Sequence, residues 1–122
     1  MALGYAQASD RVGVFNIVPG PGFLNAGASL ATAQGLNAKV LCLVGQIPQA
    51  KQGQGTGVLH EIPDQFAILR QLTKWAAQVN SPLAAPQLVA EAFQQILSGR
   101  PGPAGLEIPM DVLQASGTVA DM

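Results

Sequence analysis

The stretch Val12-Gly-Val-Phe-Asn-Ile-Val18-Pro-Gly-Pro-Gly22 decides the fold of this chain. Its first seven residues are mostly β-branched or aromatic, which is typical of a parallel strand buried on both faces. The segment from Pro19 to Gly22 then stops the strand, and residues 24–34 follow with helical spacing and many small side chains. This order of strand, tight turn and helix predicts one βα unit of an α/β domain.

Strands and helices alternate along the rest of the chain as well. Glycines at 35 and 99 are expected to cap two of the helices, and Pro63-Asp64 is expected to open another. The expected helices cover residues 1–9, 24–34, a segment starting at 63, and 86–98, and the expected strands cover 12–18, 39–44, 73–79 and 104–108. The alternation predicts an α/β domain with a mostly parallel sheet.

The chain is short, apolar and weakly charged. Hydrophobic residues make up 48% of its 122 residues and charged residues 11%, whereas an average soluble domain carries about 25% charged residues. Two explanations remain open at this point. Either the strands of a small domain are buried on both faces, or the domain is incomplete and its apolar faces need a partner.

Charge and hydropathy narrow the classes of partner. The net charge is −1, and the six basic residues are scattered along the sequence, so no cluster could neutralise adjacent phosphates of a nucleic acid. No apolar run has the length of a transmembrane helix, so no membrane partner is expected. The single cysteine, Cys42, lies in an apolar strand, which favours a core residue over a nucleophile and a cytoplasmic location over a secreted one.

The turn Gly20-Pro21-Gly22 with Asn25 is the most informative local motif. A strand that ends in this turn and leads into a helix of small residues exposes backbone amides and lets a flat ligand approach the main chain. The same residues are also expected in a tight βα turn that needs glycine for a positive φ. The spacing alone favours this second interpretation.

A glycine-rich segment and the only histidine follow the second strand. Gly53-x-Gly55-x-Gly57 lacks the Gly-Lys-Ser/Thr ending of a phosphate loop, so a mobile loop is expected. His60 cannot build a metal site alone, and no metal site is expected. It could shuttle protons in a pocket, although a surface histidine is the commoner outcome. The acidic residues fall mostly at turns or outer faces, and none is expected to be catalytic.

The order of the motifs is more specific than any one of them. The chain resembles the pyrimidine-binding (PYR) domain of thiamine-diphosphate enzymes of the acetolactate synthase and benzoylformate decarboxylase type, with the resemblance covering residues 1–113 and a flexible tail expected at 114–122. It is carried by Met1–Ala6, Gly13-Val14, Pro19–Gly22 with Asn25, Leu41–Gln46, His60-Glu61, Thr73–Trp75, Gly99–Pro103, Leu106–Pro109 and Asp111-Val112.

The resemblance implies a cofactor, thiamine diphosphate with Mg²⁺, held between two subunits. It implies the three-layer α/β sandwich of that domain, with a parallel sheet, and it implies that Gly20, Pro21, Gly22 and Asn25 face the pyrimidine ring. It also implies that Gln46, His60 and Glu61 line the substrate side or the dimer interface. The full-length enzymes decarboxylate or join 2-keto acids, with a PYR-domain glutamate activating the cofactor and a separate PP domain binding the diphosphate through the metal.

Two parts of the family pattern are missing from this sequence. The activating glutamate belongs to a helix upstream of Met1, and the Gly-Asp-Gly and Asn-Asn pairs of the PP domain do not occur. The expectation is therefore a partial PYR domain, without its first strand and helix and inactive alone. It would form a homodimer or associate with a chain that carries a PP domain. The alternative is a non-catalytic, self-associating module that retains the PYR fold.

Overall fold

The computed structural model describes residues 1–117 and contains one parallel β-sheet. Its strands are β1 (Gly13–Ile17), β2 (Val40–Gln46), β3 (Trp75–Gln78) and β4 (Ala104–Pro109). They lie in the order β1-β2-β4-β3, and every neighbouring pair is parallel. The predicted α/β class with a parallel sheet is confirmed.

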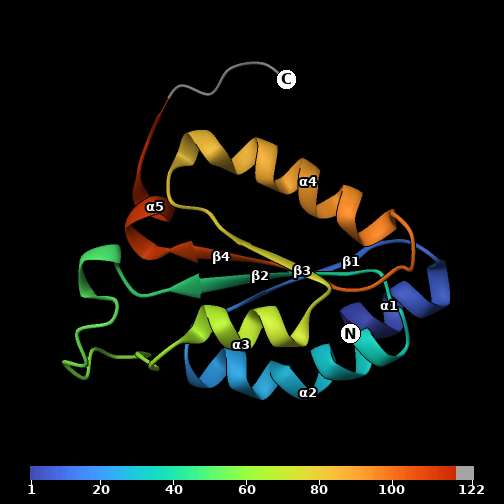
Figure 1. Ribbon diagram of the computed structural model, residues 1–122, viewed down its shortest axis with the longest axis horizontal. Helices are drawn as coiled ribbons and strands as arrows, with labels where there is room; N and C mark the ends of the chain where they lie inside the picture. The colour runs from blue at the N-terminus through green and yellow to red at the C-terminus, as the bar shows by residue number, and fades with distance from the viewer. Residues whose placement is uncertain (118–122) are drawn as a thin grey trace.

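Helices cover both faces of this sheet, as Figure 1 shows. Helices α1 (Ala2–Ser9), α2 (Pro21–Gly35) and α3 (Gln65–Leu72) pack on one face, and α4 (Ala85–Leu97) packs on the other. The short helix α5 (Met110–Gln114) follows β4 directly, and two 3₁₀ turns cover Gln49–Lys51 and Pro82–Ala84. The result is the predicted three-layer sandwich, with one apolar core on each side of the sheet.

Several predicted element ends are wrong. Helix α2 begins at Pro21 and includes Gly35, and the left-handed residue after it is Asn37, with a φ of 54°. Asp64 is the N-cap of α3, because its Oδ1 accepts a hydrogen bond from the backbone N–H of Ala67 at 2.9 Å. Pro63 therefore lies outside the helix that it was expected to open.

The chain after β4 also differs from the expectation. Residues 110–114 form α5, whereas the sequence predicted no helix there. Val112 of α5 is buried against the core beneath α4, which explains why this short helix forms. The flexible tail was predicted for residues 114–122, and residues 118–122 of it lie outside the described residues.

Small side chains in the middle of the sheet let α3 pack closely against it. The register places the small residues Cys42, Gly105 and Ala76 in one row across β2, β4 and β3, next to Phe15 of β1. Leu69 of α3 is fully buried above this row, and a β-carbon added to Gly105 would lie 2.5 Å from the Cδ1 atom of Leu69. The absence of a side chain at Gly105 therefore creates the space that Leu69 fills.

Cys42 lies in the same row and is fully buried. Its burial raises the pKa of the thiol from 9.0 to about 12, because an apolar environment penalises the thiolate. A cysteine needs its thiolate form to act as a nucleophile, so this residue is unsuited to chemistry near neutral pH. The prediction of a core cysteine is confirmed.

Within residues 1–117, no helix is both long enough and apolar enough to cross a membrane.

Candidate functional site

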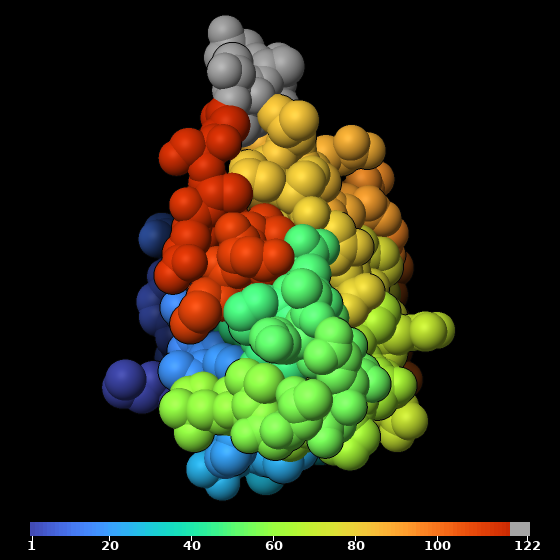
Figure 2. Space-filling view, turned by 90° about the vertical axis from the view of Figure 1, so that its left-hand side faces the viewer, coloured from blue at the N-terminus to red at the C-terminus, as the bar shows by residue number. Residues whose placement is uncertain are grey.

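A cleft of about 590 Å³ lies where strands β1 and β2 end. The carboxyl ends of parallel strands are where α/β proteins usually bind ligands. Figure 1 shows β2 and β4 pointing towards α5 and the segment that follows β2, and Figure 2 looks onto this end of the molecule. The lining residues come from four segments: Asn16–Pro19, Gly45–Pro48, Val58–His60, and Met110 with Leu113.

Most of the residues that line this cleft are apolar. The polar side chains among them belong to Asn16, Gln46 and His60, and none of the lining residues is an aspartate or glutamate. Apolar walls with a few polar groups are typical of sites for small organic ligands, and the volume lies within the usual range of about 300–1,000 Å³. The cleft therefore suits a small, largely apolar ligand, and its own side chains offer no carboxylate for proton transfer.

Gln46 lines the cleft, but its side chain is already hydrogen-bonded within the protein. Its Oε1 accepts a hydrogen bond from the backbone N–H of Ile47 at 2.8 Å, and its Nε2 donates to Oε2 of Glu107 at 3.2 Å. The residue is only 8% exposed. Gln46 therefore shapes the floor of the cleft.

The turn from Gly20 to Gly22 supports the cleft from behind and does not line it. Gly20 has a φ of 61°, and a β-carbon on it would overlap the backbone carbonyl of His60. The close approach that this glycine permits is therefore to the protein's own loop. Asn25 is exposed on α2 and lies outside the residues that line the cleft.

His60 is brought to the cleft by an unusual backbone conformation. Its φ is 72°, which is uncommon for a residue with a side chain, and its backbone contacts Gly20. The neighbouring Leu59 is 79% exposed and also lines the cleft. The segment 58–60 therefore forms one wall of the cleft, fixed in place against the turn at Gly20.

The glycine-rich segment is organised around Glu61. One oxygen of this carboxylate accepts a hydrogen bond from the N–H of Gly55 at 3.0 Å, and the other accepts from Gly57 at 2.8 Å and Val58 at 3.0 Å. These are the backbone groups that a phosphate-binding loop would offer to an anion. Glu61 therefore holds the loop together, and its carboxylate faces the loop instead of the cleft.

Behind the cleft lies a buried polar network that the sequence analysis did not predict. Glu107 of β4 is 0% exposed, and its carboxylate accepts hydrogen bonds from the Nε2 atoms of three glutamines. The distances are 3.2 Å for Gln46, 2.8 Å for Gln65 and 2.9 Å for Gln78. Because all three donors are neutral amides, the network satisfies the carboxylate without a cationic partner.

Gln65 links this network to the turn at Gly20. Its Oε1 accepts a hydrogen bond from the N–H of Gly20 at 2.7 Å, and its Nε2 donates to the carbonyl of Gly45 at 2.9 Å as well as to Glu107. Gln65 itself is 1% exposed. Most of the acids were expected at turns or outer faces, and Glu107 is an exception, because it is buried in β4. Its position inside an apolar strand segment, residues 104–109, was the available signal.

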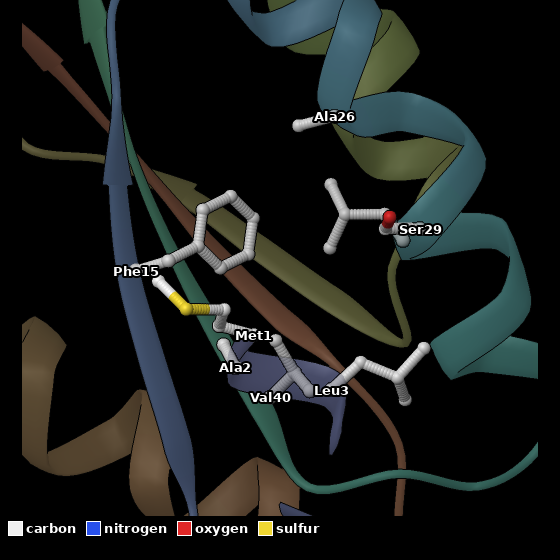
Figure 3. Close-up of a pocket in the computed structure, with 8 residues that line it drawn as sticks. Met1, Ala2, Leu3, Phe15, Ala26, Ser29 and Val40 are labelled. Atoms are coloured by element: carbon white, nitrogen blue, oxygen red, sulfur yellow. The ribbon is translucent and has the colours of Figure 1, made fainter. Parts of the chain in front are cut away.

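A second hollow, of about 250 Å³, lies beside the edge strand β1. Figure 3 shows Met1, Ala2 and Leu3 on one side of it, with Phe15 of β1 nearby and Ser29 on α2. Ser29 provides the only polar side chain in its lining. This apolar hollow carries no group for acid–base or nucleophilic chemistry.

Residues 1–68 match the family described as "Thiamine pyrophosphate enzyme, N-terminal TPP binding domain". This match covers more than half of the chain. The chain belongs to this family. The resemblance seen in the sequence motifs is thereby confirmed, and the cleft at the carboxyl ends of β1 and β2 is the candidate site of a member of this family.

Curated relatives extend the similarity along most of the chain. The probable 2-ketoarginine decarboxylase of Pseudomonas aeruginosa is 36% identical over 115 residues, covering 94% of this chain and 21% of that protein. An acetolactate synthase of Arthrospira platensis is 40% identical over 109 residues, covering 89% and 18%. The mitochondrial acetolactate synthase catalytic subunit of Saccharomyces cerevisiae is 37% identical, covering 94% and 16%. The chain thus spans about a fifth of the length of these relatives.

Proposed function

We propose that this chain supplies the pyrimidine-facing wall of a thiamine-diphosphate-dependent 2-keto acid decarboxylase or carboligase of the acetolactate synthase type. The observation that carries the proposal is the apolar cleft at the carboxyl ends of β1 and β2, in a chain of this family. The single, buried cysteine fits a cytoplasmic setting, which we include in the proposal.

The residues of the cleft fit the aminopyrimidine half of the cofactor. Pro19, Ile47 and Leu59 offer apolar surface to a flat ring, and the turn at Gly20 fixes the wall behind it. The diphosphate half does not find its partners here, because residues 1–117 contain no group of three His, Cys, Asp or Glu side chains placed to hold a metal ion. We therefore assign the diphosphate and its Mg²⁺ to a PP domain on another chain or segment.

The chain alone is proposed to be inactive. Thiamine diphosphate, when bound, stabilises the negative charge that develops as the bond beside a 2-keto group breaks. This chain's own residues exclude water from the ring and orient it, but the cleft lining contains no carboxylate to exchange a proton with it. The activating acid must therefore come from outside this cleft.

Binding of thiamine to the isolated chain tests the first half of the proposal. Thiamine carries the aminopyrimidine ring without the diphosphate, so we expect weak binding, seen as NMR shifts of the methyl groups of Val18, Ile47 and Leu59. The variant Leu59→Asp should lose the shifts at Val18 and Ile47. The matched variant Leu83→Asp, at another exposed leucine (63%) outside the cleft, should keep them. Shifts confined to other surfaces, or none at saturating thiamine, would refute the proposed site.

An assay of carbon dioxide release tests the second half. With thiamine diphosphate, Mg²⁺ and pyruvate, the chain is expected to release no more carbon dioxide than a sample without protein. Turnover that disappears in the Leu59→Asp variant would show that the chain is active alone and that the acid lies within it.

Self-association is the second candidate function, and the surface around β1 favours it. Within residues 1–117, strand β1 pairs only with β2, so its other edge is open. Val14 lies on this strand and is 50% exposed, and Val18 follows it and is 54% exposed. The apolar hollow of Figure 3 lies beside the same strand. An open strand edge with apolar neighbours is a surface that natural proteins usually cover. We propose that a second copy of the chain covers it.

Sedimentation velocity tests this proposal with a pair of variants. The chain is expected to sediment as a dimer, and Val14→Lys is expected to convert it to a monomer, because a lysine on an edge strand opposes strand pairing. Val89→Lys, which changes a 38% exposed valine on α4, should remain a dimer. If the wild-type chain sediments as a monomer, or if the Val14→Lys variant still sediments as a dimer, β1 is excluded as the interface.

A further inference from the structure

The buried network around Glu107 connects the centre of the sheet to the turn behind the cleft. We propose that Gln65 and Glu107 are positioning residues, which fix the turn at Gly20 and through it the wall formed by His60. The inference deepens the proposed function and, in its effect on ligand binding, rests on it. Its structural part stands on the hydrogen bonds alone.

Gln65 is hydrogen-bonded to the turn at Gly20. The N–H of Gly20 lies directly before helix α2 and donates to Oε1 of Gln65 at 2.7 Å. This bond joins residues 45 positions apart, so it fixes the turn relative to α3. Because the Gly20 backbone touches His60, a shift of the turn would move the segment 58–60 that lines the cleft.

Glu107 determines which way the Gln65 amide points. An amide side chain can rotate to exchange its oxygen and nitrogen, and only one of the two orientations presents an acceptor to Gly20. Glu107 and the carbonyl of Gly45 both accept from Nε2 of Gln65, at 2.8 and 2.9 Å. Two acceptors on one side hold the nitrogen there, so the oxygen faces Gly20.

The carboxylate of Glu107 is itself held on both oxygens. Oε2 accepts from Gln46 and Gln65, and Oε1 accepts from Gln78. Gln46 also lines the cleft, so the Glu107 carboxylate is bonded directly to the floor of the cleft. The same carboxylate is linked to the wall of the cleft through Gln65 and the turn at Gly20. Among residues 1–117, no buried side-chain nitrogen or oxygen lacks a partner, so the network is fully satisfied.

The network also provides its own control. Gln78 donates to the same carboxylate at 2.9 Å, yet no hydrogen bond joins its side chain to Gly20 or to the cleft. Gln65→Met and Gln78→Met each remove one hydrogen bond to Glu107 with a side chain of similar length. Only the first removes the acceptor of the Gly20 N–H.

Hydrogen exchange of the Gly20 amide, followed by NMR on the intact chain, is the primary test. In Gln65→Met we expect Gly20 to exchange about tenfold faster, as loss of one hydrogen bond of ordinary strength predicts. The exchange rates of the amides in the centre of β2 should change by no more in Gln65→Met than in Gln78→Met. In Gln78→Met the Gly20 amide should keep its protection. Equal effects of both variants on Gly20, or no effect of Gln65→Met, would overturn the proposal and reduce the network to general stabilisation.

Substitutions of Glu107 test its orienting role separately. In Glu107→Gln the new amide can keep its oxygen towards Gln46 and Gln65, while its nitrogen meets Gln78, which is free to rotate its own amide. Gly20 protection should therefore be retained. In Glu107→Leu both acceptor positions are lost, and Gly20 protection should fall as in Gln65→Met. Loss of protection in Glu107→Gln as well would show that the charge, and not the orientation of Gln65, matters.

Thiamine titration then separates this inference from the proposed function. If both hold, Gln65→Met should weaken the binding of thiamine about tenfold and Gln78→Met should not, at a temperature where all variants are folded. If the wild-type chain fails to bind thiamine while the Gly20 results stand, the proposed function fails and the positioning of the turn survives. If Gln65→Met binds thiamine as tightly as wild type, the positioning role for the ligand is wrong.

Discussion

Replacing Gly20 by alanine should lower the free energy of unfolding by about 3 kcal/mol. Two costs combine. The backbone of Gly20 has a φ of 61° and a ψ of −119°, outside the left-handed helical region, and a β-carbon in such a sparsely populated conformation costs about 1–3 kcal/mol. The same β-carbon would lie 2.9 Å from the carbonyl carbon of His60, and crowding in a packed region costs about 1–3 kcal/mol more.

Gly99 provides the matched control for this substitution. It also has a positive φ, of 54°, but a β-carbon on it would meet no heavy atom within 4 Å. Gly99→Ala should therefore show only the backbone cost, about 1–2 kcal/mol. Urea unfolding of both variants measures the difference. If the two cost the same, the contact between Gly20 and His60 contributes nothing and the wall at 58–60 is not fixed by the turn.

The fold was predictable because its signals are local. The apolar run before Pro19 and the one at 39–44 each have the length and composition of a buried strand, and the α4 segment has one clear apolar face. The prediction errors occur where a contact between residues far apart in the sequence determines the local structure. Helix α5 forms because Val112 reaches the core under α4, and no periodicity within five residues could indicate that.

The candidate site was predictable only in part, for the same reason. The predicted residues Gln46 and His60 do line the cleft, because they follow or approach the carboxyl ends of neighbouring strands. Asn25 does not, because α2 begins at Pro21 and so places residue 25 on an exposed turn of the helix. The partners of Glu107 come from three separate segments, and only the folded chain brings their amides together.

Replacing Gly105 by alanine should also destabilise the chain by about 3 kcal/mol, for a reason located in the core. A β-carbon at this position would lie 2.5, 2.8 and 2.9 Å from three side-chain atoms of Leu69. Leu69 is fully buried, so it cannot move aside into solvent, and overpacking of this kind costs about 1–3 kcal/mol. The alanine would therefore push α3 away from the sheet, and with it Gln65, which lies at the start of the same helix.

Two further variants decide whether Leu69 is the cause. Leu69→Ala alone should cost about 2–5 kcal/mol through the cavity that it leaves. In the double variant the new β-carbon at position 105 would occupy part of that cavity. The double variant should therefore lose less unfolding free energy than the two single variants together, by more than about 1 kcal/mol. Gly35→Ala, at a helical glycine with no heavy atom within 4 Å, should be neutral or slightly stabilising. Strictly additive costs in urea unfolding would show that the row of small residues does not determine how closely α3 packs on the sheet.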